Sequence, residues 1–158
     1  MTVSPGDQAP LAVRAPLPGR AIPLASVPDQ VFAQAMVGPG AAIDPHPRPL
    51  DAVAPVDGTL MKLHPHAFVV VGADTRAVLV HLGIDTVQLE GKGFTLLAEE
   101  GDPVTAGQPL VHWNPAEVAS TGRSPVCPVI ALEATPEALT DLVDSGEVTP
   151  TTTLFTWR

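Results

Sequence analysis

The runs Leu63–Val71 (LHPHAFVVV) and Arg76–Thr86 (RAVLVHLGIDT) decide how this chain folds. Both runs are rich in β-branched and apolar residues, and a short segment that begins with glycine separates them. This pattern is typical of two antiparallel strands joined by a tight turn, and we predict such a hairpin here. With the turn centred between positions 73 and 74, His66 is expected to lie directly opposite His81.

The predicted hairpin brings two imidazole rings onto one apolar face. Side chains directly opposite each other on paired strands have Cβ atoms about 4.5–5.5 Å apart, and Phe68 is expected opposite Leu79 beside the histidines. A single histidine at the end of a strand is most often a half-buried residue with an ordinary hydrogen bond. Two titratable rings on an apolar face cost stability, so their pairing points to a functional site.

The composition restricts the class of protein. At 158 residues the chain suits one domain with an aliphatic core, because 45% of the residues are hydrophobic and only 4% are aromatic. A net charge of −9 with only two lysines argues against a nucleic-acid surface, which needs clustered basic residues. The single cysteine, Cys127, excludes an internal disulfide and any multi-cysteine metal site.

The sequence also predicts a location. No apolar run approaches the roughly 18 residues that a membrane-spanning helix needs, so we expect no direct insertion into a membrane. The segment Met1–Asp7 has neither a basic nor a long apolar region, which argues against a signal peptide. A single cysteine fits a reducing compartment. We therefore expect a cytoplasmic protein.

The order of elements predicts an all-β fold. Many short strands separated by Gly and Pro turns, with a few short helices, favour an antiparallel β-sandwich or a partly closed barrel. Residues 15–24 can be laid over residues 54–63 with matching Ala, Pro, Gly and Leu, which predicts an internal duplication. Residues 1–12 are expected to be a disordered lead-in. Helices are expected at three places: 28–36, 114–122 and 135–146.

Specific motifs in and after the hairpin point to a known family. The segments His64–Phe68 and Val80–Val87 resemble the glucose-type enzyme IIA of the bacterial phosphoenolpyruvate sugar phosphotransferase system. The resemblance spans residues 13–158, which would form one EIIA type-1 domain with a fold of barrel-sandwich hybrid type. Further matches occur in the family's order: Ala15–Gly19, Val27–Asp29, Val31–Ala33, Met36–Gly40, Ala54–Thr59, Glu90–Phe94 and Ala98–Gly101.

The resemblance implies a phosphotransferase that carries phosphoryl groups during uptake of a sugar of the glucose or N-acetylglucosamine class. His81 would accept the group from phospho-HPr and pass it to a cysteine of an enzyme IIB domain of a membrane permease, while His66 donates an N–H to the phosphoryl oxygens. The carbonyl of Gly83 would fix the tautomer of His81. His64, which stands where the family usually has a hydroxyl residue, would support the relay. No metal or ATP is required, because the donor is already a phosphohistidine.

The resemblance also implies a docking surface on a monomer. An apolar patch around the histidines would exclude water, which competes as a phosphoryl acceptor. Acidic residues at its edge, Asp29 and Asp85, would face basic partners. The apolar members expected in the patch are Phe32, Leu63, Phe68, Leu79 and Leu82.

Two other functions fit parts of the same pattern. His64, His66 and His81 are ligand types for a zinc-dependent hydrolase of LytM-like type, with Asp85 four residues after the last, but that class has its H-x-x-x-D element before H-x-H. Zinc held only by His66 and His81 would need a carboxylate from a partner. The segment around Lys62 is similar to biotinyl or lipoyl carriers, but these place the lysine at a hairpin tip.

Overall fold

The computed structural model describes residues 9–72 and 74–158, which form mostly short strands. The helical segments are α1 (Gln30–Ala33), α2 (Pro115–Ser120), η2 (Leu24–Ser26), η3 (Thr86–Leu89) and η4 (Pro136–Ala138). The strands are β1 (Leu11–Arg14), β2 (Gly19–Ile22), β3 (Gly40–Pro45), β4 (Leu50–Val53), β5 (Gly58–His64), β6 (Ala67–Val71), β7 (Ala77–His81), β8 (Phe94–Leu96), β9 (Pro103–Val104), β10 (Pro109–Trp113), β11 (Cys127–Ala131), β12 (Leu139–Thr140), β13 (Glu147–Val148) and β14 (Thr153–Trp157). The predicted all-β class is confirmed.

The first strand begins earlier than the predicted domain. β1 starts at Leu11, two residues before the expected boundary at residue 13. Its partner is β14, with Leu11 opposite Trp157. The remainder of the predicted lead-in, residues 1–8, lies outside the described residues.

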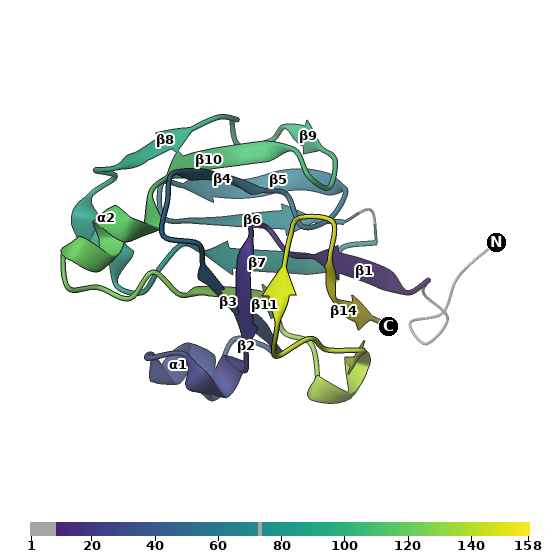
Figure 1. Ribbon diagram of the computed structural model, residues 1–158. Coiled ribbons are helices and arrows are strands. Elements are labelled where there is room, and N and C mark those ends of the chain that lie inside the picture. Colours follow the sequence, from purple (N-terminus) through teal and green to yellow (C-terminus); the bar gives the residue numbers. More distant parts are fainter. Residues whose placement is uncertain (1–8, 73) are drawn as a thin grey trace.

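In the described part of the chain the strands form three antiparallel sheets. The largest has the order β13-β2-β3-β11-β7-β6-β5-β9, and the smaller ones have the orders β1-β14-β12 and β4-β10-β8. In Figure 1 β8 and β10 lie along the top, β1 and β14 lie at the right, and β6 and β7 of the large sheet lie in the middle with β2, β3 and β11 below them. Because β13 and β9 are the edges of the large sheet, it does not close into a barrel, and the fold is an open sandwich.

The predicted internal duplication is visible in the strand pairing. The two halves of the large sheet mirror each other about its centre: counted from the two edges inward, β2 corresponds to β5, β3 to β6 and β11 to β7. The glycines matched in the sequence repeat, Gly19 and Gly58, each begin a strand. Each also lies opposite the second residue of a short edge strand, Val148 of β13 for Gly19 and Val104 of β9 for Gly58. The repeat in the sequence is therefore a repeat of structure.

The entries to the two repeats bind each other reciprocally. The N–H of Arg14 donates to the carbonyl of Pro55 (3.0 Å), and the N–H of Val53 donates to the carbonyl of Pro16 (2.7 Å). These two hydrogen bonds are related by the same offset as the sequence repeat, so the halves are arranged about an approximate two-fold axis. One half consists of β4 to β10 and is inserted between β3 and β11 of the other.

The central hairpin has a register one residue away from the prediction. Ala67, and not the preceding residue, lies opposite His81. The cause is the turn, which is closed by a hydrogen bond from the Gly72 N–H to the Arg76 carbonyl (2.9 Å) and contains three residues. Its last residue, Thr75, is left-handed (φ 72°), where such loops usually have glycine. The sequence therefore carried no signal for this turn.

His66 lies outside the strands that the sequence predicted around it. β5 ends at His64 and β6 begins at Ala67, and these two residues pair with each other. Pro65 and His66 are thus the two-residue turn of a second hairpin. The side chain of a turn residue is free of the alternation that governs a strand, so the register error does not separate the two histidines.

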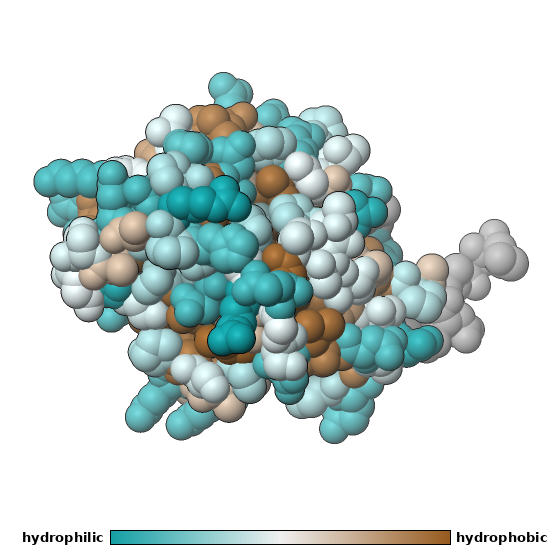
Figure 2. All heavy atoms as spheres, in the orientation of Figure 1, coloured by the Kyte–Doolittle hydropathy of each residue, from teal (hydrophilic) through white to brown (hydrophobic). Residues whose placement is uncertain are grey.

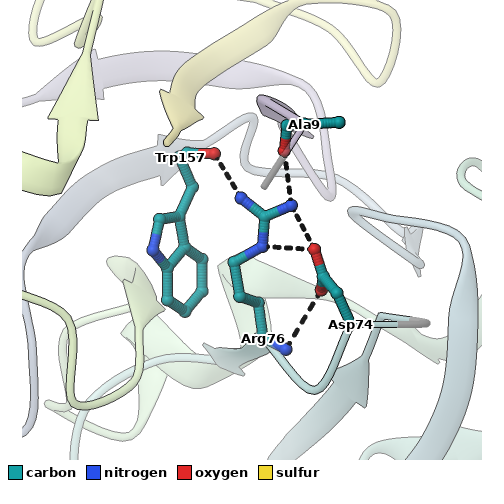
Figure 3. Close-up of polar contacts among 4 residues, drawn as sticks. All are labelled: Ala9, Asp74, Arg76 and Trp157. Carbon is teal, nitrogen blue, oxygen red and sulfur yellow. Dashed lines mark hydrogen bonds and ion pairs between the residues drawn. The ribbon is translucent and has the colours of Figure 1, made fainter. Parts of the chain in front are cut away.

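A buried arginine ties the three-residue turn to both ends of the described chain (Figure 3). The side chain of Arg76 is only 9% exposed and forms an ion pair with Asp74. Its Nε donates to Asp74 Oδ2 (2.7 Å), its Nη1 to the carbonyl of Trp157 (2.6 Å) and its Nη2 to the carbonyl of Ala9 (2.7 Å). These contacts hold the turn, β1 and β14 in one arrangement.

Two of the three predicted helices are present. α1 lies within 28–36, and α2 within 114–122 is capped by Asn114, whose side chain accepts from the Ala116 N–H (3.0 Å). The helix predicted over 135–146 is wrong, because the chain forms η4 and then β12, which pairs with β14. No helix among the described residues is long and apolar enough to cross a membrane.

Buried apolar residues form a main core and a smaller cluster. The main core joins all three sheets, and Trp113, Phe68 and Phe155 are its largest wholly buried side chains. The smaller cluster lies on the opposite face of β3 and β11, where η2 and α1 supply part of it; its members are Leu24, Val27, Ala42, Ile84 and Ile130. Figure 2 shows that the visible surface is mostly hydrophilic, with separate apolar patches near its top, its centre and its lower part.

Candidate active site

His81 lies at the end of β7, on the face that carries the smaller apolar cluster. Along β7, Val78 and Val80 point into the main core, while Leu79 packs against the smaller cluster on the other side. The alternation of a strand places His81 on the same side as Leu79. The catalytic candidate is therefore attached to a rigid strand but directed away from the core.

A backbone carbonyl fixes the tautomer of His81. Its Nδ1 lies 2.5 Å from the carbonyl oxygen of Gly83, as the sequence comparison with the family predicted. A carbonyl only accepts, so Nδ1 carries the proton and Nε2 keeps its lone pair. Gly83 is left-handed (φ 82°), and a Cβ there would lie 2.7 Å from Thr86 Cγ2 and 3.1 Å from the carbonyl oxygen of Ser124. Only glycine suits this position.

The rings around His81 form a short row. The ring centroids of His81 and His66 are 5.3 Å apart in an edge-on arrangement, and those of His66 and His64 are 5.7 Å apart and nearly parallel. Phe32 of α1 lies 5.3 Å from His81. The structure thus brings together His64, His66 and His81, which the sequence had placed in this site.

Both inner histidines are held neutral by their surroundings. Burial lowers the pKa of His81, although the bond to Gly83 and the charges of Asp29 and Asp85 oppose this shift. Burial is also the main cause that lowers the pKa of His66, and repulsion from His81 and His64 adds to it. At neutral pH the pair therefore offers a neutral nucleophile beside a neutral ring that can donate an N–H.

Three of the residues expected in the docking patch are in the core instead. Phe68 and Leu82 are fully buried and Leu63 is 8% exposed, so their side chains cannot contact a partner. The register error is the reason for Phe68: it lies opposite Val80 on the inner face. All three belong to the main core.

Other members of the patch are placed as expected. Phe32 and Leu79 are half-buried against the smaller cluster. Asp29 caps α1 by accepting from the backbone N–H of Phe32 (3.3 Å) and of the preceding residue, and Asp85 is exposed. Val69, which was not predicted as part of the patch, is half-buried and lies opposite Leu79 on the outer face. Strand alternation in the correct register would have found it.

The site offers little support for a metal centre. Within the part of the chain that the structure describes, no group of three or more His, Cys, Asp or Glu side chains is arranged to hold a metal ion. His64 extends the row beyond His66 and does not complete a three-histidine cluster around one point. The zinc-hydrolase alternative therefore finds no support in this geometry.

Comparisons with known proteins agree in their result. Residues 11–136 match the sequence model of the family described as phosphoenolpyruvate-dependent sugar phosphotransferase system, EIIA 1. A PTS system glucose-specific EIIA component of Staphylococcus aureus (strain COL) is 35% identical over 143 residues, which cover 89% of this chain and 85% of that protein. The corresponding component of Oceanobacillus iheyensis is 38% identical over 122 residues, covering 76% and 73%. The solved glucose permease IIA from Mycoplasma capricolum superposes with a TM-score of 0.86 at 33% identity, covering 96% of this chain and 97% of that one.

Proposed function

Because this chain belongs to the EIIA 1 family of the phosphoenolpyruvate-dependent sugar phosphotransferase system, we propose that His81 is the residue on which it carries the phosphoryl group. The family supplies the overall activity, which is phosphoryl transfer during sugar uptake. The observation that supports His81 is the hydrogen bond from its Nδ1 to Gly83. That bond leaves Nε2 as a nucleophile beside the ring of His66.

The transfer needs no change in the proton on Nδ1. The Nε2 lone pair of His81 attacks phosphorus in phospho-HPr, a new N–P bond forms, and the N–P bond of the donor breaks with its electrons returning to the donor's ring. Charge in the transition state lies on the three equatorial oxygens. An N–H of His66 is placed to stabilise those oxygens, as donors do in an oxyanion hole.

The onward step is a second displacement at phosphorus, in which His81 is the leaving group. A cysteine thiolate of an enzyme IIB domain attacks phosphorus, an S–P bond forms, and Nε2 regains its lone pair. The bond to Gly83 keeps the neutral leaving ring in its starting tautomer. His64, stacked on His66, orients the ring of His66.

Both partners dock on the outer face of β6 and β7. The apolar residues there are Leu79, Val69 and Phe32, with Asp29 and Asp85 at the edge to meet basic side chains. We propose that the protein works as a monomer without a resident cofactor, because the donor supplies an activated phosphoryl group. Zinc between His66 and His81 requires a carboxylate from a docked partner, so it belongs to a complex and not to the isolated chain.

Labelling experiments test this proposal. The protein is incubated with enzyme I, HPr and phosphoenolpyruvate carrying a labelled phosphoryl group, and the label is mapped in the native chain and in variants. We expect an acid-labile label in the native chain, none that is stable in His81→Ala, and poor onward transfer from His66→Ala. His112→Ala, on β10, is the matched control and should behave as the native chain. Stable label in His81→Ala contradicts the assignment.

A further inference from the structure

A polar hollow lies beside the loop that follows His81. Its volume is about 360 Å³. The loop after α2 forms one wall and is joined to the His81 loop by a hydrogen bond from the Ile84 N–H to the Ser124 carbonyl (2.8 Å). The residues that matter for its chemistry are Pro28, Ile84, Asp85, Gln88, Arg123 and Ser124.

The hollow is continuous with the proposed docking face. Asp85 lines it, and Pro28 immediately precedes Asp29. Both Asp29 and Asp85 are close enough to His81 for their charges to act on that ring. A protein that covers His81 therefore extends to the hollow.

Within the described part of the chain, the side chain of Arg123 has one hydrogen bond in this hollow, to a neutral residue. Its Nη2 donates to the side-chain oxygen of Gln88 (3.0 Å), a neutral and exposed residue. Its Nε is buried and has no hydrogen-bond partner among residues 9–72 and 74–158. Asp85 lines the same hollow, but within those residues no ion pair joins it to Arg123. Buried polar groups in native proteins nearly always have partners, so the unpartnered Nε–H of Arg123 at a surface hollow indicates a missing acceptor.

We propose that Arg123 binds a carboxylate of the protein that docks on His81, next to the basic residue already expected at Asp85. Arginine presents donors in a planar fork that matches a carboxylate, and such charge-assisted bonds are stronger than the bond to Gln88 that they would replace. The chain has a net charge of −9, so a basic partner fits most of its surface. Arg123 would favour a partner that has one acidic residue at this point over a partner whose docking surface is basic throughout.

The proposal rests on the proposed function, since it assumes that a phosphoryl donor or acceptor covers His81. The phosphoryl donor and the phosphoryl acceptor approach the same Nε2 of His81, so both contact the surface around it. Small anions such as phosphate or acetate are the alternative occupants, because they carry the same oxygen acceptors. They would bind the free chain, whereas the proposed carboxylate arrives only with the partner.

The test compares Arg123→Gln with Arg20→Gln, which removes the same charge from an exposed position on β2, separated from β7 by β3 and β11. Initial rates of labelling from phospho-HPr and of transfer to enzyme IIB are measured at increasing partner concentration. We expect Arg123→Gln to raise KM at least about tenfold in one or both steps with kcat unchanged, and Arg20→Gln to match the native chain. Circular dichroism of both variants confirms that the fold is kept.

A charge exchange identifies the partner's residue. Arg123→Glu should weaken the same step further, and replacing one acidic residue of the partner by lysine should restore it. Equal KM values for Arg123→Gln, Arg20→Gln and the native chain overturn the proposal, as does a shift of the Arg123 Nε–H resonance on adding millimolar phosphate or acetate to the free chain. Loss of labelling in the native chain would instead overturn the proposed function, so the two failures are distinguishable.

Discussion

Phosphorylation of His81 should reverse the direction of the pKa shift of His66. In the unphosphorylated protein, burial and the neighbouring rings of His81 and His64 lower the pKa of His66. A phosphoryl group on Nε2 of His81 brings nearly two negative charges to the edge of the His66 ring. Attraction to these charges favours the protonated imidazolium and opposes all three of the present effects.

The size of this interaction follows from the distance. The ring centroids of His66 and His81 are 5.3 Å apart. At that separation one pair of unit charges interacts by about 0.8 kcal/mol at a dielectric constant of about 80 and by about 3 kcal/mol at an effective value of about 20. His66 is half-buried, so the true value lies between these limits for each unit of phosphoryl charge. Counted for nearly two charges, both limits raise the pKa of His66 and favour a charged donor to the phosphoryl oxygens.

The assay is a proton–nitrogen NMR titration of the imidazole rings. The nitrogen shifts of His66 are followed from pH 5 to pH 9 in the free protein and in protein kept phosphorylated by enzyme I, HPr and phosphoenolpyruvate. We expect the midpoint for His66 to move to higher pH on phosphorylation, while the resonances of His112, on β10, are unaffected. A midpoint for His66 that stays in place, or moves to lower pH, refutes the reasoning and removes His66 as a charged donor.

Three further predictions concern the frame of the site. Replacing the buried cation in Arg76→Met should cost about 3–5 kcal/mol in urea unfolding. The hydrogen bond from Arg76 is the main cause that lowers the pKa of Asp74. This pair therefore stabilises the protein at pH values above the pKa of the unfolded carboxyl group, and the stabilisation is lost as the pH falls through the pKa of Asp74 in the folded protein. The native chain should lose more stability than Arg76→Met on acidification below about pH 4, and equal losses would contradict the pairing. Gly83→Ala forces a left-handed alanine with a Cβ 2.7 Å from Thr86 Cγ2, and we expect a cost of at least about 1–2 kcal/mol in thermal unfolding together with slower labelling of His81; native-like values for both would show that the loop adapts. Burial raises the pKa of Cys127 to about 12, so a thiol reagent at pH 8 should leave the folded protein unmodified and react in urea; modification of the folded chain would contradict its burial.

Much of the fold was predictable because local chemistry determined it. Asn114 before Pro115 specified the start of α2, and the repeated glycines specified where β2 and β5 begin. The helix expected over 135–146 failed because tertiary pairing overrode the local pattern, and Leu139 and Thr140 form the short strand β12. There β12 gains hydrogen bonds from β14, and the sequence of the segment alone does not contain its partner.

The site was predicted better than the hairpin that carries it. His66 and His81 come together although the expected pairing was wrong, because His66 occupies a turn and is not bound to strand alternation. The docking patch depended on that alternation, and the one-residue shift moved Phe68 to the inner face. The left-handed Thr75 that sets the register has no glycine to indicate it.

The insertion of one repeat inside the other sets the order in which this protein can be completed. β1 leaves the ribosome long before its partner β14, which lies more than 130 residues further along the chain. At about 5–20 residues per second, the edge of β1 stays without its partner for some 7–30 seconds in each round of synthesis. Within the inserted half, β4 to β10, every strand pairing except that of β7 with β11 is internal, and this half emerges before β11. A nascent chain can therefore form most pairings of the half that bears His66 and His81 first, and the outer half closes around it only after β14 has emerged.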